Sequence, residues 1–148
     1  MSARPFPTQW AAGHVLGFEV RVRPISREGK TGRERDAFLA AVEKADGREL
    51  NRSEVYVQWL RELLERQGGA ELVGASVTRY QLLGVTRKSQ KTNSDDARHS
   101  RLVSGPDAVL TGQLRVADPQ AFAQLLARGV GRHRAFGFGL LLLRSIRG

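Results

Sequence analysis

Residues 15–23 alternate between apolar and polar side chains, and this alternation constrains the fold more than any other part of the sequence. The apolar positions are Leu16, Phe18, Val20 and Val22. Because successive side chains of a β-strand point to opposite faces, the pattern predicts a half-buried strand that ends at Pro24. The polar face of this strand would carry Arg21 and Arg23, whose guanidinium groups could contact phosphates, as could that of Arg115 on a later strand.

The next strong pattern is a helix that begins after Asn51. Glu54 follows three residues later, which resembles a capping box, and apolar residues then recur at helical spacing. Tyr56 and Trp59 lie on this apolar stripe, so we expect both in the core. The Gly68-Gly69 pair ends the helix.

Residues 25–45 carry weaker patterns. Residues 25–34 are polar and basic around Gly29 and Gly32, which predicts an exposed loop. Residues 35–45 place Phe38 and neighbouring apolar residues on one side, which predicts a short helix.

Three further strands are predicted at residues 75–85, at 109–116 and in the apolar run 140–143, which suits a central strand. Asp118-Pro119 begins a helix that ends at Gly129, because a carboxylate caps well and proline fits the first helical position. The order predicts an α+β, ferredoxin-like (RRM-like) βαββαβ fold, with a four-stranded antiparallel sheet and helices on one face. The other face of the sheet would be free to bind a ligand.

The chain has 148 residues and no cysteine. This length predicts a single domain over residues 15–148, after residues 1–14 as a leader or the remnant of an interdomain connection. The lack of cysteine excludes disulfides and thiolate sites, and no histidine or carboxylate spacing indicates a metal, so we expect no metal and no cofactor. No apolar run has the length of a membrane span or a signal peptide, which predicts a cytoplasmic protein without a membrane partner.

Lysine and arginine number 24 against 15 acidic residues, which gives a formal net charge of +9. Such a charge attracts polyanions, and the prevailing arginine favours bidentate contacts to phosphate. The charge therefore favours a nucleic acid as partner. The alternative is that a GC-rich genome alone accounts for the arginine content.

Residues 129–139 form the most distinctive segment of the sequence. Backbone N–H groups in glycine-rich turns can bind anions, and basic side chains add charge there, so we expect an RNA-binding site. The candidate residues are Gly129, Gly131, Arg132, His133, Arg134, Gly137 and Gly139. The segment is no dinucleotide fingerprint, because Arg134 stands where the third glycine belongs. The alternative is a tight turn between helix and strand, with Phe136 and Phe138 in the core.

The polar stretch at residues 86–101 is a second candidate RNA contact. Its cations are Arg87, Lys88, Lys91, Arg98 and Arg101. Such a stretch could follow the phosphates of an RNA stem according to shape, or it could be a solvated connection that binds nothing.

The catalytic residue is unknown from these patterns. His133 is the candidate within the chain, because imidazole titrates near neutrality and the flanking arginines could stabilise a phosphorane. A phosphate contact is the alternative role of His133. His14 and His99 are expected to have no catalytic role.

Taken together, these segments resemble the CasE family of CRISPR RNA-processing endoribonucleases from the type I-E Cascade system. Residues 125–141 are similar to its glycine-rich C-terminal signature. Residues 18–24, 55–60 and 110–119 resemble its proline-terminated strand, its Trp-Leu helix and the capped strand before its last helix.

The resemblance implies binding of a CRISPR repeat hairpin RNA and metal-independent cleavage by attack of a ribose 2′-hydroxyl. It implies two ferredoxin-like domains, of which this chain matches the second. The family's catalytic histidine lies in the first, so no residue here inherits that role and enzymatic activity stays open. The implied partners are the repeat hairpin, other Cascade subunits and possibly a separate N-terminal domain chain.

Three hypotheses remain open at this point. The chain is a domain that holds the repeat hairpin, or an active endoribonuclease that uses His133 or a histidine of a partner chain. The third is a non-catalytic ferredoxin-like module for protein interaction or a small ligand.

Overall fold

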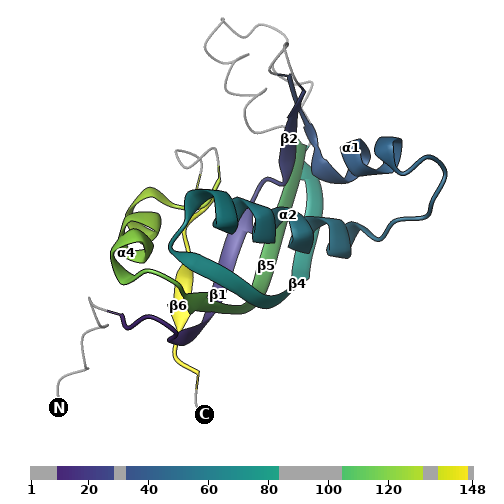
Figure 1. The fold of residues 1–148 in the computed structure, drawn as a ribbon. Helices are drawn as coiled ribbons and strands as arrows, with labels where there is room; N and C mark the ends of the chain where they lie inside the picture. Colours follow the sequence, from purple (N-terminus) through teal and green to yellow (C-terminus); the bar gives the residue numbers. More distant parts are fainter. Residues whose placement is uncertain (1–9, 29–32, 84–104, 132–136, 147–148) are drawn as a thin grey trace, which may run out of the picture.

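The computed structural model describes residues 10–28, 33–83, 105–131 and 137–146. A four-stranded antiparallel sheet with the spatial order β4-β5-β1-β6 forms its centre (Figure 1). The strands are β1 (Val15–Val22), β4 (Ala70–Leu83), β5 (Gly105–Val116) and β6 (Leu142–Arg144). The predicted ferredoxin-like arrangement is confirmed.

The alternation of β1 sets the two faces of the sheet. Leu16 pairs with Leu114 and Val20 with Leu110 on β5, and all four side chains are buried. Since the register places apolar positions opposite one another, a shift by one residue would turn this set toward solvent. The opposite face, here called the open face, carries the odd-numbered residues of β1 and β5.

In the part of the chain that the structure describes, the sheet is accompanied by the helices α1 (Ala37–Lys44), α2 (Arg52–Gln67) and α4 (Pro119–Arg128). The Asn51 side chain caps α2 by accepting from the Glu54 N–H at 3.2 Å. Asp118 caps α4 by accepting from the Gln120 N–H at 3.0 Å. The predicted helix starts at these two positions are confirmed.

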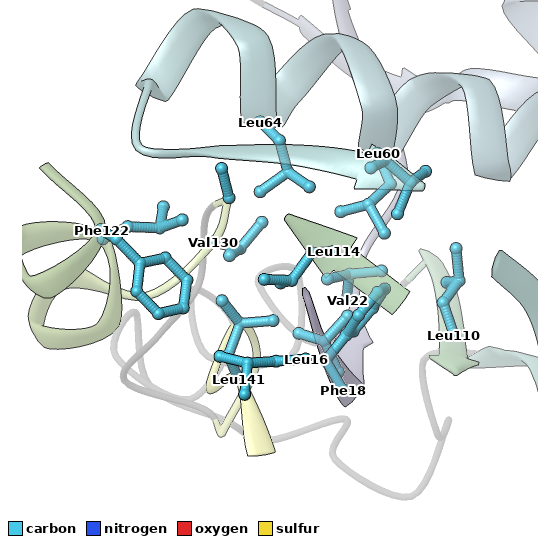
Figure 2. Close-up of a cluster of buried hydrophobic side chains, with 14 of the residues drawn as sticks. Leu16, Phe18, Val22, Leu60, Leu64, Leu110, Leu114, Phe122, Val130 and Leu141 are labelled. Carbon is cyan, nitrogen blue, oxygen red and sulfur yellow. The ribbon is translucent and has the colours of Figure 1, made fainter. Parts of the chain in front are cut away.

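The core lies between one face of the sheet and the helices (Figure 2). Tyr56, Leu60 and Leu64 from α2 and Phe122 from α4 are almost completely buried there. The predicted helical face of α2 is therefore confirmed, and Trp59 packs against the same cluster while partly exposed.

The prediction of an exposed loop at residues 25–34 is wrong for most of that range. β2 (Ile25–Glu28) and β3 (Arg33–Asp36) pair as an antiparallel hairpin, with Ile25 opposite Asp36. Apart from Ile25, the paired residues are polar. No hydrophobic alternation marks the hairpin, so periodicity could not detect it.

The expectation of a central last strand is also wrong, because β6 lies at the edge of the sheet beside β1. Leu141 is buried at 7% exposure, whereas Leu140 and Leu142 are 62% and 51% exposed. The apolar run at residues 140–143 is therefore not buried throughout. Leu141 is in the core, whereas Leu140 and Leu142 are apolar side chains exposed at the edge of the sheet.

Residues 10–14 are joined to the sheet and to α4. Trp10 contacts Phe122 edge-to-face with ring centroids 5.1 Å apart. The Gly13 N–H donates to the Val116 carbonyl at 2.7 Å, beyond the paired residues of β1. None of the helices in the described ranges has the length and apolar character to cross a membrane.

Candidate nucleic-acid interface

The glycine segment is closed at its base by two backbone hydrogen bonds. The Val130 N–H donates to the Gly139 carbonyl at 2.7 Å, and the Gly139 N–H donates to the Arg21 carbonyl at 2.7 Å. The two ends of the segment are thus joined to each other and tied to β1. This geometry fixes where the residues between Val130 and Gly139 leave the sheet.

Gly139 is required at this closure for two reasons. Its φ is +89°, and a Cβ built on it would lie 2.4 Å from the Val130 carbonyl oxygen. Gly129 has φ +84° and ends α4 by donating to the Leu125 carbonyl. Both glycines therefore have a backbone role apart from any ligand.

Gln67, the last residue of α2, holds the beginning of the segment. Its Nε2 donates to the Gly129 carbonyl at 3.3 Å, and its Oε1 accepts from the Gly131 N–H at 3.4 Å. Sequence reasoning missed Gln67, because no local pattern links it to a segment about sixty residues away.

Phe138 lies beneath Arg21 of β1. Its side chain is 2% exposed, and the Arg21 guanidinium carbon lies 4.8 Å from the ring centroid. Of the two roles left open for Phe138, packing in the interior is the one the structure supports, because a base could not reach this ring.

Several predicted contact residues lie outside the described ranges. They are Arg132, His133, Arg134, Arg87, Lys88, Lys91, Arg98 and Arg101. His99 and Phe136 lie outside as well, whereas His14 is exposed at the start of β1.

Arg23 joins the attachment points of both predicted RNA-binding segments. Its Nη2 would lie 2.3 Å from a Cβ built on Gly105, which has φ +119° and pairs with Leu83 across the ends of β4 and β5. The Arg23 guanidinium also lies 5.9 Å from the Phe138 ring centroid. The glycine segment and residues 84–104 therefore leave the fold at the same end of the sheet.

The burial of Arg23 corrects its predicted place on an exposed strand face. Only 5% of the residue is exposed, and Nε and Nη1 have no hydrogen-bond partner among the described residues. Burial lowers the pKa of Arg23, while the charges of Glu34 and Asp107 oppose this shift. Guanidinium stays protonated even so, and a cation is held where the segments meet.

The β2–β3 hairpin is attached to α2 at the same end of the fold. The Trp59 indole N–H donates to the Ile25 carbonyl at 3.0 Å. The Ala37 N–H donates to the Pro24 carbonyl at 2.8 Å. These contacts fix both strands of the hairpin where it leaves the core (Figure 1). Arg27 on β2 is exposed.

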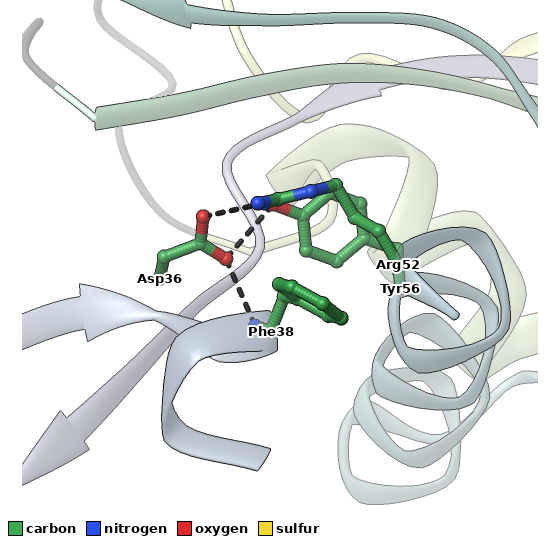
Figure 3. Close-up of polar contacts among 4 residues, drawn as sticks. All are labelled: Asp36, Phe38, Arg52 and Tyr56. Carbon is green, nitrogen blue, oxygen red and sulfur yellow. Dashed lines mark hydrogen bonds and ion pairs between the residues drawn. The ribbon is translucent and has the colours of Figure 1, made fainter. Parts of the chain in front are cut away.

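A buried polar cluster completes this attachment (Figure 3). Asp36 accepts from the Tyr56 hydroxyl, the Arg52 guanidinium and the Phe38 N–H at 2.8, 2.8 and 2.9 Å. The Arg52 guanidinium carbon lies 4.3 Å from the Phe38 ring centroid and 4.5 Å from that of Tyr80. Burial, with the nearby Asp36 carboxylate, raises the pKa of Tyr56 far above its usual range.

Three arginines on the open face, Arg21, Arg115 and Arg144, are engaged in cross-strand ion pairs. Arg21 donates to both carboxylate oxygens of Asp107, at 2.8 and 2.6 Å. Arg115 lies 3.7 Å from Glu71, and Arg144 lies 3.4 Å from Glu19. A phosphate on this face would have to compete with these carboxylates.

Metal chemistry has no candidate ligand set in the described ranges, where no three His, Asp or Glu residues come together. The site described so far is one end of the sheet, where the β2–β3 hairpin, the closed glycine segment and the buried Arg23 meet. It is here called the cationic end, because residues 84–104 and 129–139, which are attached there, contain more basic than acidic residues.

The chain matches the family described as "CRISPR associated protein" over residues 1–145. It is 30% identical over 138 residues to the CRISPR-associated endoribonuclease Cse3 of Thermus thermophilus, covering 93% of this chain and 59% of that protein. The chain thus spans about three-fifths of the length of this relative.

Solved structures show the same fold. The structure of Thermus thermophilus Cse3 bound to an RNA representing a pre-cleavage complex is 26% identical, with a TM-score of 0.68, covering 96% of this chain and 59% of that one. Cas6e from Escherichia coli is 19% identical, with a TM-score of 0.57, covering 97% and 66%. With the family match over nearly the whole sequence, the chain belongs to the CasE-type family of CRISPR-associated proteins.

Proposed function

We propose that this chain binds the hairpin of a CRISPR repeat RNA and takes part in its processing, as the C-terminal RNA-binding part of a CasE-like endoribonuclease. The observation that carries the proposal is the convergence of three segments at one end of the sheet, two of which are basic in sequence. The β2–β3 hairpin of the protein, the glycine segment and residues 84–104 are all attached around Arg23 and Gly105. The similarity to a Cse3 structure solved with a bound 19-nt RNA supports the choice of ligand.

The residues expected to contact the RNA are those of the glycine segment and of residues 86–101. Arg27 of the β2–β3 hairpin is added to them. A narrow two-stranded arm and a glycine-rich backbone suit recognition of phosphates and helix shape. Arg132, His133 and Arg134 would extend the charge of the glycine segment, and the cations of residues 86–101 would follow the stem.

Base stacking on the open face is not part of the proposal. In RRM-type recognition, aromatic side chains on the sheet stack on bases. The open-face positions of β1 and β5 carry no aromatic residue, and Arg21, Arg115 and Glu19 form cross-strand ion pairs there. The ferredoxin-like sheet therefore serves as a support for the cationic end.

A direct test uses the purified chain, a CRISPR-repeat hairpin and a scrambled RNA of the same length, without divalent metal. Binding is measured on native gels between low and moderate salt. We expect preference for the hairpin and a steep loss of affinity with salt, about 0.9 in log–log slope per phosphate contacted. Arg27→Ala should weaken RNA binding and lower the slope of log affinity against log salt by the amount expected for about one phosphate contact. The matched control Arg48→Ala should change neither the affinity nor the slope.

Equal binding of both RNAs would overturn the proposal and favour the alternative, a non-catalytic protein-interaction or small-ligand module. Denaturing gels of the same samples address cleavage. We propose that the chain supplies binding and positioning, and that other Cascade subunits or a separate N-terminal domain chain complete the assembly in the cytoplasm. A cut at the hairpin base that His133→Ala abolishes would instead place the chemistry in this chain.

The domain arrangement is proposed in the same terms, with residues 15–148 as one ferredoxin-like domain and residues 1–14 leading into it. Urea unfolding followed by tryptophan fluorescence and by circular dichroism should give one coincident transition, and two separate transitions would contradict the single domain.

A further inference from the structure

A pocket of about 320 Å³ lies on the open face beside the cationic end. It is lined by Arg21, Arg79, Tyr80, Gln81, Asp107 and Val109, which come from β1, β4 and β5. Small-ligand sites begin at about 300 Å³, so the pocket is the size of one nucleotide and far too narrow for a duplex. None of the residues assigned above to hairpin binding lines it.

The floor of the pocket is preorganised around Asp107, which is 4% exposed. Arg21 engages both oxygens of its carboxylate, and the Gln81 Nε2 donates to Oδ2 at 2.8 Å. Since a carboxylate only accepts hydrogen bonds, this contact fixes the orientation of the Gln81 amide. The Gln81 Oε1 is then left as an acceptor that no described residue engages.

The charge of the pocket favours an anion. Two arginines against one aspartate leave a net charge of +1 among the lining residues. Arg21 is held by Asp107, whereas Arg79 is exposed and forms no hydrogen bond with any residue that the structure describes. The pocket therefore offers one cation without a hydrogen-bond partner in the described ranges, whose charge also acts on Asp107, beside a fixed neutral acceptor.

The position of Arg79 follows from a β-bulge. The register of β4 against β5 shifts between Val77 and Arg79, and Thr78 is the extra residue. The Thr78 hydroxyl donates to the Val109 carbonyl at 3.2 Å, which engages a backbone group on β5 beside the bulge. Bulges re-aim side chains in this way and are frequent beside binding sites.

We propose that this pocket binds one unpaired ribonucleotide adjoining the repeat hairpin, with its phosphate at Arg79 and a base N–H donor at the Gln81 Oε1. The Tyr80 ring takes no part in this contact, because it lies on the helix side of the sheet, 5.9 Å from the Tyr56 ring centroid. The inference rests on the proposed function, because it assumes that the RNA hairpin docks at the cationic end of the sheet, beside this pocket.

The test compares three forms of repeat hairpin by fluorescence anisotropy: blunt, extended by three unpaired nucleotides at the 5′ or 3′ end, and extended by abasic nucleotides. The wild-type chain should bind one extended form about tenfold tighter than the blunt form, as one engaged base and phosphate would give. The abasic form should retain only part of this gain.

Arg79→Ala should abolish the gain, leave affinity for the blunt hairpin unchanged and lower the salt slope for the extended RNA by about 0.7. Arg79→Lys should restore part of the gain, and the control Arg48→Ala should behave as wild type. Equal binding of blunt and extended RNA by the wild-type chain, or an unaltered gain in Arg79→Ala, overturns the pocket assignment alone. Absence of any binding to the blunt hairpin overturns the proposed function instead.

Discussion

The Tyr56 hydroxyl on α2 donates a 2.8 Å hydrogen bond to Oδ1 of Asp36 at the end of β3, 20 positions away in the sequence. Asp36 also caps α1 through the Phe38 N–H. One carboxylate thus links the hairpin, α1 and α2. The direction in which the hairpin leaves the fold depends on this contact.

Tyr56→Phe removes this hydrogen bond, and with it the 2.7 Å hydrogen bond that the Arg52 guanidinium donates to the hydroxyl, but keeps the buried ring. Asp36 retains Arg52 and the Phe38 N–H, so we expect a loss of about 1–2 kcal/mol in the free energy of unfolding, measured by urea denaturation. Tyr80→Phe is the control, since the Tyr80 hydroxyl has no hydrogen bond to a described residue, and it should cost less than about 0.5 kcal/mol. Equal losses in both variants would contradict the assigned role of Asp36.

Gly139→Ala should destabilise the chain by more than Gly137→Ala. Both glycines have φ +89°, so each variant loses about 1–2 kcal/mol to a left-handed alanine. Only at Gly139 would the new Cβ meet backbone, 2.4 Å from the Val130 carbonyl, whereas nothing lies within 4 Å at Gly137. Thermal unfolding of the two variants measures the difference, and a reversed order would refute the closure at Gly139.

Gln67→Ala should loosen the glycine segment with little effect on global stability. Both lost hydrogen bonds involve an exposed side chain, so the free energy of unfolding should fall by no more than about 1 kcal/mol. Hairpin RNA affinity should fall, because the backbone from Gly129 to Gly131 is no longer held by α2. Glu65→Ala, on the same helix, provides the control. Unchanged affinity in Gln67→Ala would show that this support is irrelevant to binding.

Stability should depend on pH through Asp107. Burial raises the pKa of this carboxyl, but the hydrogen bonds from Arg21 and Gln81, together with the charge of Arg21, bring it below its ordinary value. The unfolded chain then binds the proton more readily, so the contribution of Asp107 is complete above about pH 4 and is lost as pH falls through the native pKa.

Asp107→Asn should therefore cost about 1–3 kcal/mol at pH 7, and the gap to wild type should narrow below about pH 4. Urea unfolding at pH 7, 5 and 3 measures this. Glu71→Gln, which removes an exposed ion pair with Arg115, should cost less than about 1 kcal/mol at every pH. A gap for Asp107→Asn that is constant down to pH 3 would contradict the expected linkage.

The order of strands and helices was predictable because each main element has its own local pattern. β1 shows period-two alternation, and α2 and α4 have capping residues and terminal glycines. The fold and the family resemblance followed from these patterns together. Local patterns also predicted that Tyr56 belongs to the core.

The hairpin and the edge position of β6 were not predictable from the same patterns. The stability of the hairpin comes from contacts distant in sequence, such as Trp59 to the Ile25 carbonyl and Tyr56 to Asp36. The position of β6 depends on which strand lies beside β1, and an apolar run does not encode this. Arg23 was misplaced because strand alternation was extended past Val22, where the chain turns into the hairpin.

The bulges of β4 have a consequence for the behaviour of the protein in solution. β4 is a 14-residue strand at the edge of the sheet, with Val73 and Leu82 exposed. A long, regular edge of this kind would act as a template for strand pairing between molecules. Register shifts at Leu72/Gly74 and at Val77/Arg79 interrupt the row of free backbone groups. These interruptions disfavour pairing of β4 with an edge strand of another molecule.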